Sequence, residues 1–295
     1  MTTALLAKAE TGEGRQPPRA IPQLSVIVLT YNEQANLPAC LESLAGLACT
    51  IFVVDSGSSD GTVALAERLS AVVSHHSFEN YAAQRNWALD NLPIQTPWVL
   101  NLDADERLTP ELRDEIKGLL EECPDDVSGF LLRRRTVFMG RWIRYGGHYP
   151  SYHLRLFRQG AGRCETRRYD QHFIASGHVG RLRNDYIDIV ASSLHTWTVR
   201  HAKWAAMEAS ESLGAPQNGS QVIPAVLGNP IQRRQWWRNV YGRGPLFARA
   251  LVYWLYRYFI RLGFLDGKEG MIFHLLQGFW FRFLVDAMIY EDKKA

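Results

Sequence analysis

The chain has 295 residues, a hydrophobic content of 46% and a net charge of only +3. This composition excludes a disordered or fibrous chain, and the near-neutral charge argues against a uniformly basic nucleic-acid binder. The four cysteines include no CxxC pair, so we expect neither a zinc site nor a disulfide framework. Residues 1–20 mix charges, glycine and a Pro-Pro pair without a long apolar core. We therefore expect a flexible tail rather than a secretory signal, and a protein that stays in the cytoplasm.

The first half of the chain alternates between apolar runs and segments with helical spacing. Near-continuous apolar runs are typical of strands that are buried on both faces. The predicted strands are 24–30, 50–55, 71–74 and 98–102, and the predicted helices are 33–45, 62–69, 81–89 and 110–120. Asn32 is the expected cap of the first helix. This order predicts an α/β fold with a mostly parallel sheet and helices on both faces.

The pattern changes after residue 129. Residues 129–138 and 152–158 are predicted strands on either side of an aromatic, glycine-rich loop, and 196–213 is a predicted helix. Several glycines and prolines in 214–230 indicate a linker. We therefore expect one catalytic domain over 21–213, followed by a helical region over 214–295.

Three polar clusters follow predicted strands, at 30–33, 55–60 and 103–106. Ligands of open α/β sheets bind at the carboxyl ends of the strands, so these clusters predict one site at one sheet edge. Asp103 and Asp105, two residues apart, can hold a hard divalent cation such as Mg²⁺ or Mn²⁺ and leave positions for phosphate oxygens. Such an ion would neutralise a departing diphosphate. Asp55 can accept hydrogen bonds from a base or a ribose.

The turn at 57–61 supports a competing hypothesis. Its sequence fits G-x-S-x-G, the nucleophile elbow of an α/β-hydrolase, with Ser59 as the nucleophile. Against it, only one strand precedes the elbow strand, no HGGG-type oxyanion loop is found, and Asp103 and Asp105 stay unexplained. A serine hydrolase remains the alternative, and a non-catalytic membrane scaffold of the same fold is a third hypothesis.

Four segments together resemble the successive signatures of glycosyltransferase family 2, whose members are inverting enzymes with a GT-A fold. These segments are Thr30-Tyr31-Asn32-Glu33, Asp55-Ser56-Gly57-Ser58-Ser59-Asp60-Gly61-Thr62, Gln84-Arg85-Asn86 and Leu102-Asp103-Ala104-Asp105. The later chain is similar to bacterial members that build lipopolysaccharide core or exopolysaccharide. The resemblance implies a nucleotide-sugar donor, with a UDP-sugar expected, and a lipid-linked glycan or lipopolysaccharide acceptor.

The resemblance also implies roles for single residues. The nucleotide pocket would be lined by Thr30, Tyr31 and Glu33, with Asp55 at the base, Arg85 near the nucleotide or its phosphates, Asp103 near ribose and metal, and Asp105 as the firmer metal ligand. Inversion needs a general base for the acceptor hydroxyl. The commoner His-Glu pair of the family is absent here, and Tyr169-Asp170-Gln171-His172 stands in its neighbourhood. We expect Asp170 to be the base, with Glu165 as the second choice.

Three further residues have two interpretations each. His172 could ligate the metal or bind phosphate, or it could be structural. Arg134 and Arg155 could contact the diphosphate or the acceptor, or they could be strand-face arginines in solvent.

The C-terminal region is aromatic and basic. Residues 231–295 contain eleven Lys and Arg against five Asp and Glu. At ~100° per residue, Arg249, Arg257 and Arg261 fall within about 120° of one helix face, which predicts a basic face opposite an aromatic one. Such a helix lies in the plane of a membrane rather than across it. The alternative is a pair of aromatic helices packed on the catalytic domain or on a second subunit. We expect a peripheral enzyme on the inner face of the cytoplasmic membrane.

Overall fold

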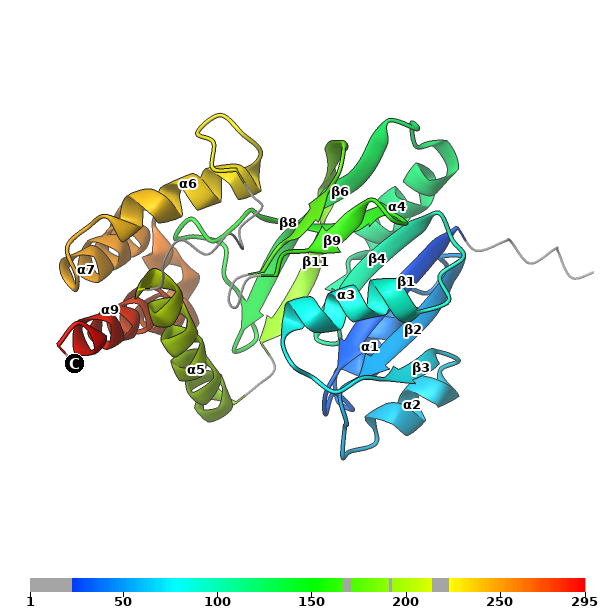
Figure 1. Ribbon diagram of the computed structural model, residues 1–295, viewed down its shortest axis with the longest axis horizontal. Coiled ribbons are helices and arrows are strands. Elements are labelled where there is room, and N and C mark those ends of the chain that lie inside the picture. Colours follow the sequence, from blue (N-terminus) through cyan, green and yellow to red (C-terminus); the bar gives the residue numbers. More distant parts are fainter. Residues whose placement is uncertain (1–22, 167–170, 191–192, 214–222, 295) are drawn as a thin grey trace, which may run out of the picture.

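The computed structural model describes residues 23–166, 171–190, 193–213 and 223–294. The expected tail over 1–20, the expected base Asp170 and part of the expected linker, residues 214–222, lie outside the described residues. The molecule has two parts, an α/β part built on one large sheet and a group of helices from α5 onward (Figure 1).

Four parallel strands form one half of the sheet, in the order β3-β2-β1-β4. Their bounds are β1 (Leu24–Thr30), β2 (Cys49–Asp55), β3 (Val72–His75) and β4 (Trp98–Asp103). The central strand β1 is buried at every position, which explains its near-continuous apolar run. Thr30 lies opposite Asp55, and Leu29 lies opposite Asp103. The carboxyl ends of these strands therefore meet at one edge, as the sequence predicted.

Helices cover both faces of this half, and the strand residues alternate between two apolar clusters. The helices are α1 (Leu37–Glu42), α2 (Thr62–Arg68), α3 (Tyr81–Asn91) and α4 (Pro110–Glu122). Leu41 of α1 and Ile116 of α4 pack with Val26 in one cluster, while Ala88 of α3 packs with Ile27 in the other. The predicted α/β architecture is confirmed. The predicted start of the first helix is wrong, because Asn32 has a left-handed backbone (φ 56°) and its side chain binds the next loop instead of capping α1.

The second half of the sheet is mixed in direction. Its strands are β5 (Glu106–Leu108), β6 (Val127–Phe138), β7 (Arg141–Trp142), β8 (Ser151–Arg158) and β11 (His178–Val190). β8 is antiparallel to both β4 and β6, whereas β11 is parallel to β6. β5 pairs with β11 and places Glu106 opposite Asp188. A separate hairpin of β9 (Gly162–Cys164) and β10 (Phe173–Ala175) lies beside the sheet.

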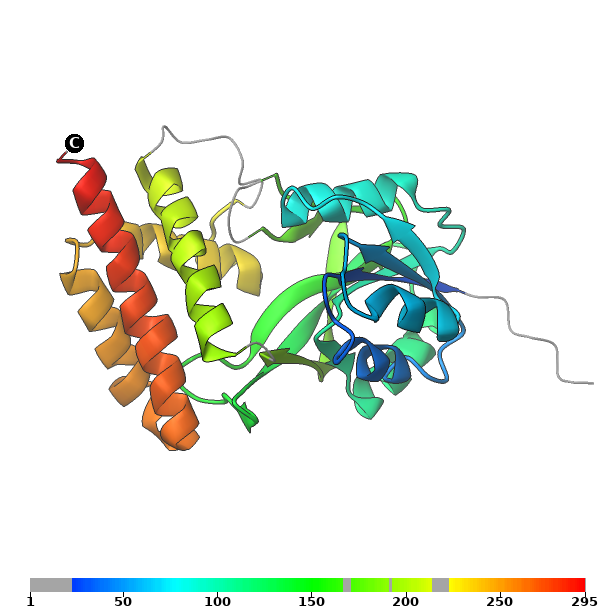
Figure 2. The same cartoon turned by 90° about the horizontal axis from the view of Figure 1, so that it is seen from below.

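The remaining helices pack together beside the sheet. They are α5 (Leu194–Leu213), α6 (Pro230–Gly242), α7 (Ala248–Leu255) with its π-helical continuation η1 (Tyr256–Ile260), η2 (Gly263–Asp266), α8 (Gly267–Phe273), η3 (His274–Trp280) and α9 (Phe281–Asp292). Figure 2 shows α5 and α9 lying along each other, and Ala205 and Ala209 meet Phe281, Val285 and Ile289 there. The continuous helical segment Gly263–Asp292 contains an 18-residue window with a mean hydropathy of 1.3 and is, by length and composition alone, long and apolar enough to cross a membrane.

Buried polar contacts join the two parts. Asp266 accepts hydrogen bonds from the backbone N–H groups of Arg144 (3.0 Å) and Tyr145 (3.0 Å). Arg257 Nε donates to the carbonyl of Gly146 at 2.6 Å. The loop between β7 and β8 is thereby fixed to the C-terminal helices.

The predicted basic face of the helix over 245–262 is wrong. Arg249 forms an ion pair with the buried Asp286, and Arg257 is only 8% exposed. Both arginines point into the protein because their partners, Asp286 and Gly146, are distant in sequence and lie on the inner side of this helix.

Candidate functional site

Two loops at the carboxyl edge of the sheet are tied together, the loop after β1 and the loop after β2. The backbone N–H of Asn32 donates to Ser58 Oγ (2.8 Å), and the N–H of Ser59 donates to Asn32 Oδ1 (2.8 Å). The N–H of Glu33 donates to Thr62 Oγ1 at 2.9 Å. These side-chain bonds make one platform of the two loops, and Tyr31 projects from it with 61% of its surface exposed.

Asp55 organises the second of these loops. It is buried, and its carboxylate accepts hydrogen bonds from Thr30 Oγ1 (3.1 Å), Ser58 Oγ (2.5 Å) and the N–H groups of Gly57 and Ser58 (both 2.9 Å). Burial alone would raise the pKa of Asp55, but these hydrogen bonds outweigh it and lower the pKa below its usual value. Asp55 is therefore an anion that shapes the turn, and its expected contact with a base stays a prediction.

The geometry does not support the hydrolase alternative. Ser59 lies within the loop between β2 and α2, not at a sharp strand-to-helix turn. Its hydroxyl faces Asn32 Oδ1 at 3.4 Å, and no histidine of the described chain is hydrogen-bonded to it. Without a base that could accept its proton, Ser59 is not an activated nucleophile.

Asp103 ends β4 between two arginines. Arg85 of α3 forms an ion pair with one carboxylate oxygen and also donates to the carbonyl of Leu102 at 3.0 Å. Arg155 of β8 lies 3.2 Å from the other oxygen and also binds Glu106. Burial would raise the pKa of Asp103, but the two guanidinium groups outweigh it and lower the pKa. Asp103 is thus held as an anion.

Asp105, two residues further on, is in the opposite situation. Within the described part of the chain, its carboxylate has no hydrogen-bond or ion-pair partner. Burial raises its pKa well above the usual value, as do the charges of Asp188, Asp103, Glu106 and Glu33. Burial likewise raises the pKa of Glu106, to about 7. This edge therefore has an excess of negative charge around one unpartnered carboxylate.

These residues fit a hard divalent cation. The described residues include no group of three or more His, Cys, Asp or Glu that would hold a metal by itself. Mg²⁺ sites at phosphates often use only one or two carboxylates, because the substrate and water supply the other ligands. Asp105 and Asp103 match that donor set, and a cation would relieve the repulsion around Asp105.

The structure describes only one of the two candidates for the general base. Asp170 lies outside the described residues, so its role stays a prediction. Glu165 is buried, accepts a hydrogen bond from the N–H of His172 (3.2 Å) and lies 3.5 Å from His172 Nδ1. A carboxylate buried in this way is poorly placed to meet an acceptor hydroxyl. Glu165 and His172 instead close the base of the segment that contains Asp170.

Arg85 supports the carboxylate edge from inside the protein. It is only 3% exposed and pairs with Asp103, so it positions that carboxylate, and its expected place near the nucleotide or its phosphates stays a prediction. The next residue, Asn86, exchanges hydrogen bonds with the backbone of Cys164 and fixes β9 to α3. Helix α3 therefore connects the carboxylate edge to the hairpin that leads to the expected base.

Four residues of the site were either missed from the sequence or left with two interpretations. Arg155 pairs with Asp103 and Glu106, and Arg134 lies 3.4 Å from Asp188 on β11, so neither is a solvent-facing arginine. Glu106 belonged to the polar cluster after β4, and its role as the partner of Arg155 had no sequence signal. Asp188 reaches the site only because β11 pairs with β5.

Comparison of the sequence with known proteins identifies glycosyltransferases as its relatives. The family model described as Glycosyl transferase family 2 matches residues 25–186. A lipopolysaccharide core biosynthesis glycosyltransferase, LpsC of Rhizobium meliloti (strain 1021), is 34% identical over 166 residues, which is 54% of this chain and 60% of LpsC. An uncharacterized glycosyltransferase of Rickettsia felis is 39% identical over 104 residues, 35% of this chain and 36% of that protein. The chain thus covers less than two thirds of the length of these relatives.

Among solved structures, the mannosyltransferase PcManGT from Pyrobaculum calidifontis, in complex with GDP-Man and Mn²⁺, is 16% identical. The match covers 95% of this chain and 92% of that one, with a TM-score of 0.45. S. aureus TarS 1-349 is 14% identical, covers 92% of this chain and 91% of that one, and has a TM-score of 0.43.

Proposed function

Because the chain belongs to glycosyl transferase family 2 and is a glycosyltransferase, we propose that it moves a sugar from a UDP-sugar to a lipid-linked or lipopolysaccharide acceptor, with inversion and with a bound divalent cation. The observation that carries this proposal is the contrast between Asp103 and Asp105. Asp103 is neutralised by Arg85 and Arg155, whereas Asp105 has no cationic partner among the described residues.

In the proposed site, Asp105 and Asp103 hold Mg²⁺ or Mn²⁺. When bound, the cation supplies positive charge to the departing diphosphate. The tied loops after β1 and β2 form the nucleotide side of the site, with Thr30, Tyr31, Glu33 and Asp55. The low pKa of Asp55 supports this assignment, because a rigid anionic turn can present its backbone and side chains in one fixed arrangement.

Acceptor activation is assigned to Asp170. An inverting transfer needs a base within hydrogen-bond reach of the attacking hydroxyl. The hairpin of β9 and β10 supports this choice, because Glu165 before Asp170 is hydrogen-bonded to His172 after it, and the adjacent Cys164 is bound to Asn86 of α3. The match to LpsC supports an acceptor in the lipopolysaccharide core. Such an acceptor is membrane-bound, and we propose that the enzyme is held at the inner face of the cytoplasmic membrane.

The test is a screen of nucleotide-sugars for protection against thermal unfolding, with and without Mn²⁺. The proposal expects UDP-sugars to protect, and to protect only with the metal. The best donor is then incubated, in radiolabelled form, with lipopolysaccharide-containing bacterial membranes. Label should enter the lipid fraction, and Asp170→Asn should abolish this while keeping donor protection. Failure of every nucleotide-sugar to protect would refute the proposed function, and an active Asp170→Asn variant would place the base elsewhere.

A further inference from the structure

The helix formed by α7 and η1 exposes an apolar face and buries a polar one, the opposite of what is usual for a helix in water. One face carries six large apolar side chains, which we call the apolar stripe: Leu251, Val252, Leu255, Tyr256, Phe259 and Ile260. Their spacing places them on one side of a helix. All six are exposed, Val252 at 63% and Ile260 at 72%.

The opposite face of the same helix turns polar groups into the protein. Arg257 donates to the Gly146 carbonyl at 2.6 Å and to the Tyr253 hydroxyl at 3.1 Å. Arg249 donates through Nε to Asp286 at 2.8 Å, and Asp286 also accepts a hydrogen bond from the N–H of Phe247 at 2.7 Å. Burying a guanidinium group is expensive unless it is hydrogen-bonded, so these bonds fix the rotation of the helix and hold the stripe outward.

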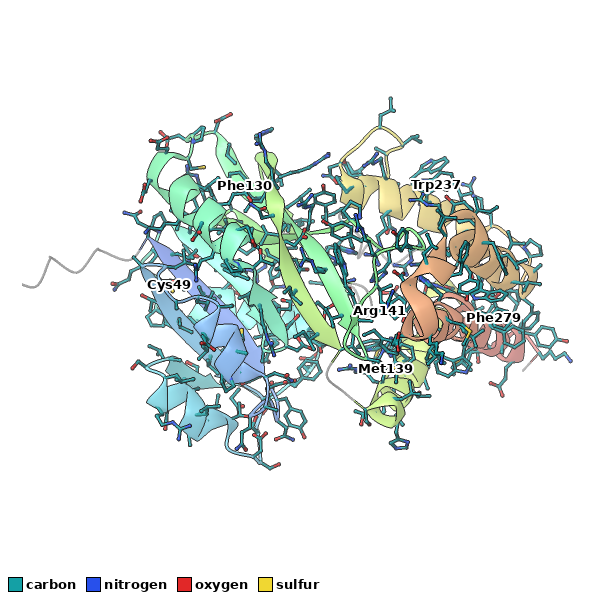
Figure 3. The ribbon with its side chains drawn as sticks, turned by 180° about the vertical axis from the view of Figure 1, so that it is seen from behind. Cys49, Phe130, Met139, Arg141, Trp237 and Phe279 are labelled. Carbon is teal, nitrogen blue, oxygen red and sulfur yellow. The ribbon has the colours of Figure 1, made fainter. Side chains whose placement is uncertain are left out.

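The apolar surface continues past the end of the helix. Leu262, Phe264, Leu265 and Met271 are each close to half exposed. Arg141 lies beside them and donates to the Leu265 carbonyl at 3.4 Å; Figure 3 shows it where the sheet part meets the C-terminal helices. Contiguous apolar surfaces of this kind on a folded protein mark contact with a membrane or another protein.

We propose that the apolar stripe inserts into one leaflet of an anionic bilayer, with α7 and η1 lying in the membrane plane. Exposed cations flank the apolar surface: Arg141, Arg144, Arg243, Arg261 and Lys268. Anionic headgroups would neutralise this rim, whereas a second copy docked on the same face would bring like charges together. The bilayer is therefore the favoured partner.

The inference rests on the proposed membrane location and names the surface that creates it. The apolar stripe also takes the place of the expected basic face as the membrane contact. The exposed cations at its rim would meet the lipid headgroups, while the inserted face is apolar. A membrane span by Gly263–Asp292 is the weaker reading, because Phe281, Val285 and Ile289 are buried against α5 and Arg282 donates to Glu208 there at 2.7 Å.

The experiment is flotation of the full chain with vesicles of phosphatidylcholine and phosphatidylglycerol. The double variant Phe259→Gln/Ile260→Gln should bind the vesicles at least about tenfold more weakly, because two apolar side chains no longer enter the lipid. The matched control is Leu69→Gln/Val72→Gln, which changes two exposed apolar residues beside α2 and β3, far from α7 in Figure 1. The control should bind like the unaltered protein, and all variants should show the same unfolding midpoint.

Insertion is read separately from surface adhesion. With Cys49→Ser and Cys123→Ser removing the two partly exposed thiols, a fluorophore is attached at Ile260→Cys or at Leu69→Cys. Brominated lipids should quench the first and leave the second unchanged. Equal flotation of the stripe variant and the unaltered protein would refute insertion of the apolar stripe but would not refute the membrane location of the protein. Failure of the unaltered protein to float would refute both, without bearing on donor protection. A dimer that dissociates in the stripe variant, with unchanged flotation, would assign the stripe to a second copy.

Discussion

The buried Arg85 of α3 forms an ion pair with the partly exposed Asp103 at the end of β4, and the same guanidinium binds the carbonyl of Leu102. One side chain thereby fixes both the backbone and the charge at the point where the candidate metal site begins. Asp105 has no such partner within the described chain. Two carboxylates of one short segment are therefore in opposite electrostatic situations, with a lowered pKa at Asp103 and a raised pKa at Asp105.

Replacing Arg85 with Gln should destabilise the protein strongly. The substitution leaves Asp103 beside buried Glu106 with only Arg155 to compensate. Removing one partner of a fully buried ion pair costs about 3–5 kcal/mol, and the cost here should lie at or below the lower end because Asp103 is 31% exposed. Urea unfolding measures the loss. Arg163→Gln, which breaks the exposed pair with Asp90 (2.8 Å), is the control and should cost about 1 kcal/mol or less. Equal losses of unfolding free energy in the two variants would show that the Arg85–Asp103 pair stabilises the protein no more than an exposed surface pair.

Asp55→Asn should remove a pH-dependent part of the stability. The pKa of Asp55 is lowered in the folded protein, so its contribution is complete above the unfolded pKa of about 3.9 and is lost as pH falls through the folded pKa. The difference in unfolding free energy between the unaltered protein and Asp55→Asn should therefore shrink below about pH 4. A difference that is constant from neutral pH to pH 3 contradicts the assignment of Asp55 as a hydrogen-bonded anion.

Asn32 should be needed both for its backbone and for its amide. Asn32→Ala loses the acceptor of the Ser59 N–H and leaves alanine at a φ of 56°, a left-handed conformation that asparagine adopts more readily because its side chain can bond locally. Asn32→Gly loses the same amide but also removes the β-carbon, and glycine adopts this conformation without strain. The glycine variant should unfold at a higher temperature than the alanine variant, and both should bind nucleotide more weakly. Equal nucleotide affinity in all three proteins would show that the tie between the loops is dispensable.

The Arg249–Asp286 pair should show strong coupling in a double-mutant cycle. Arg249→Met leaves the buried Asp286 without its counter-ion and should lower the free energy of unfolding by about 3–5 kcal/mol. Arg249→Met/Asp286→Leu removes both charges and should recover much of that stability. If the double variant is as unstable as the sum of the single variants, the pair does not fix the orientation of α7.

The sequence predicted the first half of the fold because its signals are local. The apolar run of Leu24–Thr30 marks a strand buried on both faces, and the parallel order brings Thr30, Asp55 and Asp103 to one edge by geometry alone. The direction of β8 and the pairing of β5 with β11 depend on contacts between distant segments, which no local pattern encodes.

The same limit explains the errors at the C-terminal helices. Helical spacing placed Arg249 and Arg257 on one face correctly, but it could not tell whether that face meets water or protein. The answer depends on Asp286 and Gly146, far away along the chain. The pairing of Arg85 with Asp103 was missed for the same reason, since it depends on the packing of α3 on β4.

Calorimetry of UDP binding with and without Mn²⁺, in the unaltered protein, Asp105→Asn and the exposed control Asp114→Asn, tests directly whether the carboxylate edge is a metal-assisted donor site. UDP binding to the unaltered protein and to Asp114→Asn should be strengthened at least about tenfold by Mn²⁺. Asp105→Asn should lose this dependence on the metal while keeping its fold. Binding that is equally metal-dependent in Asp105→Asn, or metal-independent in the unaltered protein, would contradict the assignment of the carboxylate edge as a metal-assisted donor site.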